Sequence, residues 1–130
     1  MFEMKEEYKL GITLIDEQHE KLFEIGNRAY LLLKDVYSID KYDKIVDIIS
    51  ELRDYTVIHF KDEEAYMESI NYKKLFTQKM DHAEFIKRVN AIDFKQMDDN
   101  QETYIMGILD FVAKWLVKHI IEKDLLMVGK

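Results

Sequence analysis

Hydrophobic side chains recur every three or four residues along most of the chain, which is the spacing of one buried face of an α-helix. The pattern is present in four runs, at residues 22–33, 45–60, 75–89 and 105–120. Short polar breaks separate the runs, at residues 38–40, 69–71 and 98–101. The pattern therefore predicts four helices and short connections.

Four helices of about 20 residues joined in this way predict an all-α, antiparallel up-down-up-down four-helix bundle. Proline is absent and glycine occurs only four times, so the turns typical of a strand-rich protein are not expected. Asp16 is a suitable N-cap for the first helix. Residues 1–15 would then form an N-terminal arm with a turn at Gly11, and residues from about Ile121 a short tail. We expect residues 1–130 to form a single domain.

The composition excludes several classes of function. Lysine and arginine total 19 against 26 aspartate and glutamate, giving a net charge of −7. A nucleic-acid partner is not expected, because a phosphate backbone needs a basic surface. Cysteine is absent, so disulfides, iron–sulfur clusters and thiolate zinc sites are excluded. A transition metal would have to be held by histidine, carboxylate or amide groups.

The N-terminal residues lack the basic start and apolar run of a signal peptide. The apolar stretches are only a few residues long, far short of the ~20 needed to span a bilayer. We therefore expect a soluble cytoplasmic protein with no membrane partner.

The four histidines fall one on each predicted helix, in phase with the apolar residues; they are His19, His59, His82 and His119. Any one of them alone fits a hydrogen-bonded histidine of the core. Four together in one bundle interior are hard to explain by packing, because each unpaired polar group there would cost a few kcal/mol. The pattern favours a shared metal site.

Two carboxylates accompany the histidines. Glu63 follows His59 by four residues, so both project from the same face of a helix. Asp124 follows His119 by five residues, a spacing that turns it off the His119 face on an ideal helix. Asp124 reaches the same point only if the helix bends or ends near residues 121–123. Otherwise it is an exposed charge in the tail.

Imidazole and bridging carboxylate groups suit iron or manganese. The Glu-x-x-His pairs of ferritin-like di-iron proteins are absent, because no glutamate stands three residues before any of the histidines. The His-Glu-x-x-His motif of zinc proteases is absent too. The residues indicate a different di-metal site.

The sequence resembles the hemerythrin family from about residue 8 to residue 126. Three ordered motifs and His82 carry the resemblance; the motifs are Ile15-Asp16-Glu17-Gln18-His19, His59-Phe60-Lys61-Asp62-Glu63-Glu64, and Trp115-Leu116-Val117-Lys118-His119-Ile120 followed by Asp124. The resemblance implies a four-helix bundle with two iron ions, bridged by an oxo or hydroxo group, that binds dioxygen at one iron.

Carried over by position, His19 and His59 would bind one iron and His82 and His119 the other. Glu63 and Asp124 would bridge the two.

The chain departs from the family pattern at two positions. The family has His-x-x-x-His on the third helix, whereas here Gln78 stands four residues before His82. An amide oxygen is a weaker iron ligand than imidazole, so this iron would have a second labile position unless Gln78 ligates it. Met4 occupies a position in the N-terminal arm at which the family often has Trp.

The resemblance implies an oxygen-binding protein for storage, delivery or sensing, with dioxygen or a small anion as its partner. An oxidoreductase that reduces peroxide or scavenges oxygen at the iron near Gln78 is the alternative, and a metal store or structural bundle is a third. Trp115 and Ile120 are candidates for the oxygen pocket, although both also fit ordinary core packing. The oligomeric state stays open, with a monomer expected.

Overall fold

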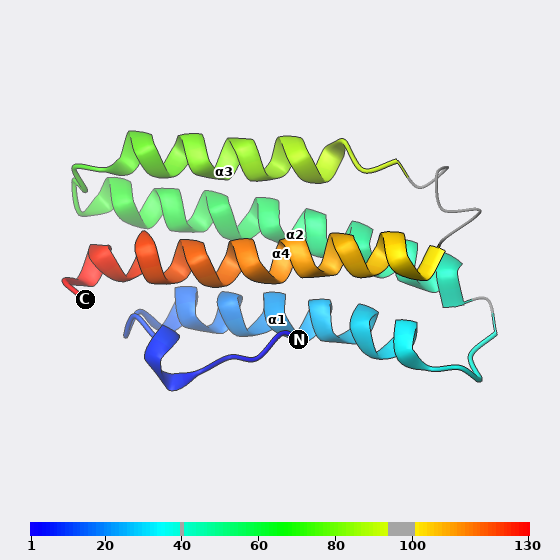
Figure 1. Cartoon of the computed structure of the whole chain (residues 1–130). Helices are drawn as coiled ribbons and strands as arrows, with labels where there is room; N and C mark the ends of the chain where they lie inside the picture. Colours follow the sequence, from blue (N-terminus) through cyan, green and yellow to red (C-terminus); the bar gives the residue numbers. More distant parts are fainter. Residues whose placement is uncertain (40, 94–100) are drawn as a thin grey trace.

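The computed structural model describes residues 1–39, 41–93 and 101–130. Four helices make up the bundle: α1 (Thr13–Lys34), α2 (Lys41–Ser69), α3 (Leu75–Asn90) and α4 (Gln101–Glu122). Successive helices run in opposite directions, and the described residues contain no strand (Figure 1). The predicted all-α, up-down-up-down fold is confirmed. The break expected at 98–101 lies outside the described residues except for Gln101.

The apolar stripes of the helices meet in one buried core. Ile15, Leu22 and Ile25 of α1 are fully buried, as are Ile45 of α2 and Ile105 of α4. Burying side chains of this size contributes roughly 1.5–3 kcal/mol each, which drives the four amphipathic helices together. None of the described helices is long and apolar enough to cross a membrane.

The first helix begins three residues earlier than predicted, at Thr13, and Asp16 is not its N-cap. Instead, the Asp16 carboxylate lies in the first turn and accepts hydrogen bonds from the backbone N–H groups of Leu10 (2.8 Å) and Gly11 (3.0 Å). Gly11 has a φ of +90°, which a residue with a side chain rarely adopts. The predicted turn at Gly11 is thus present, and Asp16 holds it against the helix.

The N-terminal arm packs into the bundle. The Phe2 side chain is buried against α1, and its backbone N–H and C=O both bond to the side chain of Asn27. The Phe2 ring lies directly over Gly26, where a Cβ would come within 2.6 Å of a ring carbon. Gly26 is therefore part of the arm's binding site on α1, and not only a member of the helical pattern.

The C-terminal segment is also ordered. Helix α4 ends at Glu122, and a short 3₁₀ helix, η3 (Asp124–Val128), follows it. This change of direction buries Asp124 and Leu125 beneath the end of the bundle. The tail expected from the sequence thus delivers a carboxylate to the interior.

Gly26→Ala should destabilise the protein by about 1–3 kcal/mol, because the added methyl group displaces the Phe2 ring from a packed site. Gly107→Ala in α4 is the matched control, since nothing lies within 4 Å of a Cβ there. That change should stabilise the protein by roughly 1 kcal/mol through helix propensity. Urea unfolding of both variants measures the difference, and equal free energies of unfolding would show that the arm is not packed on Gly26.

Candidate metal centre

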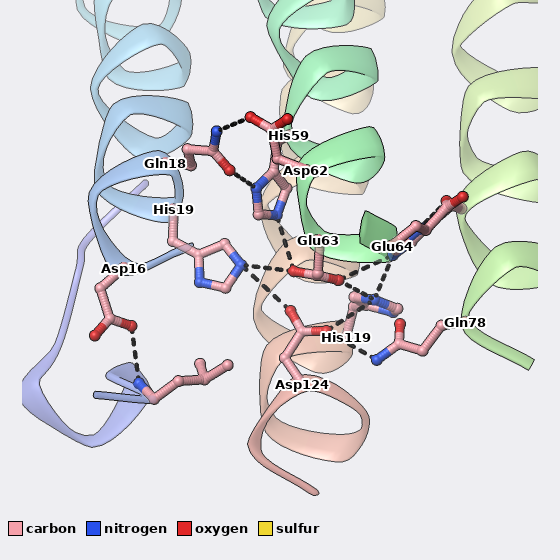
Figure 2. Close-up of polar contacts among 12 residues, drawn as sticks. Asp16, Gln18, His19, His59, Asp62, Glu63, Glu64, Gln78, His119 and Asp124 are labelled. Atoms are coloured by element: carbon pink, nitrogen blue, oxygen red, sulfur yellow. Dashed lines mark hydrogen bonds and ion pairs between the residues drawn. The ribbon is translucent and has the colours of Figure 1, made fainter. Parts of the chain in front are cut away.

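Seven polar side chains lie close together inside the bundle, and all of them except His82 are labelled in Figure 2. Their helices place them in the half of the bundle where α2 leads into α3 (Figure 1). Each is at most 7% exposed. They come from all four helices and from η3: His19 of α1, His59 and Glu63 of α2, Gln78 and His82 of α3, His119 of α4, and Asp124 of η3.

Glu63 lies between two pairs of histidines. Its Oε2 is 3.1 Å from Nε2 of His59 and 3.6 Å from Nε2 of His19. Its Oε1 is 3.1 Å from Nε2 of His82 and 3.8 Å from Nε2 of His119. One carboxylate thus presents a different oxygen to each pair.

Asp124 repeats this arrangement from the opposite side. Its Oδ2 lies 3.3 Å from Nε2 of His19, and its Oδ1 lies 3.2 Å from Nε2 of His119 (Figure 2). Because α4 ends at Glu122, the five-residue spacing between His119 and Asp124 does not turn the carboxylate away. Asp124 reaches the site because the helix ends within residues 121–123, as the sequence spacing requires.

The site therefore has two halves, which we call the first and the second pole. The first pole has His19, His59, Glu63 Oε2 and Asp124 Oδ2, and the second pole has His82, His119, Glu63 Oε1 and Asp124 Oδ1. His19, His59 and Glu63 offer ligand atoms within 4.8 Å of one another, and so do Glu63, His82 and His119. Each pole offers two imidazole nitrogens and two carboxylate oxygens.

Gln78 belongs to the second pole. Its side chain is buried, and its Nε2 donates a hydrogen bond to Asp124 Oδ1 (3.1 Å; Figure 2). The amide oxygen of Gln78 has no hydrogen-bond partner among the described residues. Gln78 does not face solvent, and its oxygen is the atom with unused capacity to bind a cation.

Hydrogen bonds outside the seven-residue cluster fix two of the imidazole rings. His59 Nδ1 donates to Gln18 Oε1 (2.8 Å), and Gln18 Nε2 donates in turn to Asp62 (2.7 Å). His82 Nδ1 donates to Glu64 Oε2 (2.8 Å). Such contacts orient histidine ligands and make the inward nitrogen a better donor.

The supporting roles of Gln18 and Glu64 were not predicted. Gln18 did leave a signal, because it is a polar residue in phase with Ile15, Leu22 and Ile25 on the buried face of α1. Glu64 leaves no such signal, since its spacing within α2 does not distinguish it from an exposed charge.

Aromatic rings cover the second pole. Phe60 stacks on His82 with ring centroids 3.9 Å apart, and Trp115 stacks on His119 at 4.6 Å. Trp115 and His119 line a surface pocket of about 430 Å³. Ile120, the other candidate for an oxygen pocket, is buried among the apolar side chains of the core.

The two carboxylates set the protonation of the histidines around them. Burial by itself lowers the pKa of His19 and of His119, but the nearby carboxylates of Asp124 and Glu63 outweigh it and raise each pKa to about 9. Burial lowers the pKa of His59. Burial would raise the pKa of Glu63, yet its bonds to the histidines hold that pKa well below its usual range.

Without a metal, therefore, protons on His19 and His119 compensate two buried carboxylates at neutral pH. A metal ion has to replace these protons, as expected where binding requires neutral imidazole.

The donor set fits a pair of transition-metal ions. Three buried oxygens in the cluster form no hydrogen bond of normal geometry with any residue that the structure describes: Glu63 Oε2, Asp124 Oδ2 and Gln78 Oε1. Buried polar atoms are normally satisfied, so unsatisfied acceptors that face imidazole nitrogens indicate that cations complete the site. Nitrogen and carboxylate ligands in this combination suit iron.

Comparison with known proteins also indicates a cation-binding protein. The sequence model of the hemerythrin HHE cation binding domain matches residues 10–130. A bacteriohemerythrin of Clostridium acetobutylicum is 53% identical over 95% of this chain and 96% of its own length. A bacteriohemerythrin of Pseudomonas aeruginosa is 31% identical over 92% of this chain and 74% of its own. A hemerythrin-like protein of Naegleria gruberi is 27% identical over 95% and 88%. No solved structure matches the chain.

Glu63→Ala and Asp124→Ala should each weaken iron binding by at least about tenfold, because either change removes an oxygen from both poles at once. Glu68→Ala, at an exposed position of the same helix as Glu63, is the control and should keep the wild-type iron content. Iron per chain after purification and dialysis measures the effect. Full iron in both site variants would contradict a shared carboxylate bridge.

Proposed function

Because the chain belongs to the hemerythrin family, we propose that it is a di-iron protein that binds dioxygen reversibly. The observation that carries this proposal is the division of each carboxylate between two histidine pairs. A single metal ion would not use both oxygens of Glu63 and of Asp124 in opposite directions, whereas two neighbouring ions would.

We assign one iron to His19 and His59 and the other to His82 and His119. Glu63 and Asp124 would be the bridging ligands, since each has an oxygen at both poles. When bound, the iron pair supplies the electrons that reversible dioxygen binding requires.

Aromatic side chains enclose the second pole. Phe60 and Trp115 stack on the two histidines of the second pole and limit the access of water to it. Trp115 lines the pocket beside His119, whereas Ile120 is buried in the core and does not line it, so Trp115 is the better candidate of the two for the oxygen pocket. Limiting water protects the oxygenated form, because proton leakage promotes unwanted side reactions.

Gln78 tunes the second pole. Its unbonded amide oxygen lies where the family pattern has an imidazole, and the hydrogen bond from its Nε2 to Asp124 holds it there. We assign it as a weak oxygen ligand of the iron on His82 and His119. An amide oxygen would hold an oxidised iron less firmly than imidazole does, so Gln78 would leave the other ligands at the second pole easier to exchange.

The proposal is tested by reducing the iron-loaded protein without oxygen, admitting air, and then removing oxygen again. The oxygenated absorption spectrum should appear and then disappear on removal of oxygen. Gln78→His should lengthen the lifetime of that spectrum in air and leave its reversibility intact, because imidazole restores a stronger ligand at the second pole.

A protein that is oxidised at once, and consumes added peroxide with a reductant, would be an oxidoreductase and would overturn the proposal. Equal lifetimes and equal iron contents in wild type and Gln78→His would show that Gln78 does not act on the iron.

A further inference from the structure

A groove of about 650 Å³ lies on the surface between α2 and α3, away from the pocket at Trp115. Its apolar lining comes from Val57 and Phe60 of α2 and from Ala83 and Ile86 of α3. The volume is that of a site for a small organic molecule, in which most of the lining is apolar and a few polar groups orient the ligand.

Three lysines line the same groove: Lys61, Lys79 and Lys87. None of them forms an ion pair with another residue in the described part of the chain. The chain has a net charge of −7, whereas these three lysines give the rim of the groove a locally positive charge.

The single carboxylate of the groove does not cancel these charges fully. Glu64 is 25% exposed, and its Oε2 accepts the hydrogen bond from His82 Nδ1. It is directed at the histidine on the inner side of the groove, so the lysine ammonium groups remain available to a ligand.

We propose that the groove binds a small organic anion, an aromatic or aliphatic carboxylate whose apolar body lies on the α2 and α3 side chains. The carboxylate would be held by the lysines, which supply charge complementarity without a fixed geometry. The bound body would contact Phe60, whose ring stacks on His82 at 3.9 Å. The binding itself does not rest on the proposed oxygen function, because apart from His82 no proposed metal ligand lines the groove.

The experiment titrates 2-naphthoate into the iron-loaded protein and follows the fluorescence of the probe. One saturable site is expected, and the neutral 2-naphthamide should bind roughly tenfold more weakly. Lys79→Ala and Lys87→Ala should each weaken 2-naphthoate binding about two- to fivefold, the range of single exposed ion pairs. Lys21→Ala, at an exposed lysine of α1 that does not line the groove, should leave it unchanged.

A second pair of variants tests the groove itself. Ala83→Trp should fill the groove and abolish binding, whereas Ala65→Trp, at an exposed position of α2 outside the lining, should not. Equal binding by the two tryptophan variants, or equal affinity for 2-naphthoate and 2-naphthamide, would overturn the proposal. Binding that survives every lysine change would also overturn it, since the anion would then be ligating iron or lying elsewhere.

Discussion

Two carboxylates without any exposed area, Glu63 and Asp124, lie in the interior of one half of the bundle, and the structure around them depends on compensating their charge. Burying an ionised carboxylate costs several kcal/mol unless opposite charge and hydrogen bonds are placed against it. The Nε2 atoms of all four histidines lie 3.1–3.8 Å from the Glu63 oxygens. Those of His19 and His119 also lie 3.2–3.3 Å from the Asp124 oxygens. Protons on His19 and His119 balance the two carboxylate charges when no metal is bound, and bound metal ions would take the place of these protons.

All four helices contribute groups that compensate the charges of the two carboxylates. Each contributes one histidine to the interior, and the end of α4 brings in Asp124 through η3. The second pole differs from the first because Gln78 lies beside it and because Phe60 and Trp115 cover its histidines. It also borders the groove between α2 and α3, which His82 and Glu64 line. Exchange of small molecules with the site is therefore expected at the second pole.

The fold and the convergence of the histidines could be predicted from the sequence, because both follow from helical spacing. What could not be predicted depends on where elements end and how side chains turn. The position of Asp124 in the interior depends on the end of α4 at Glu122. The hydrogen bonds that Asp16 accepts depend on the path of the arm at Leu10 and Gly11. The packing of Phe2 on Gly26 joins residues 24 positions apart and has no local pattern. The bond between Glu64 and His82 links two helices and likewise appears only in three dimensions.

The most direct test is calorimetric unfolding of the metal-free protein as ferrous iron is added in small steps without oxygen. Iron that binds the folded state raises the unfolding temperature by mass action. The unfolding temperature should rise steeply until two ions per chain have been added and only slowly beyond that point. A break at one ion per chain, or no rise at all, would contradict a paired metal site held by Glu63 and Asp124.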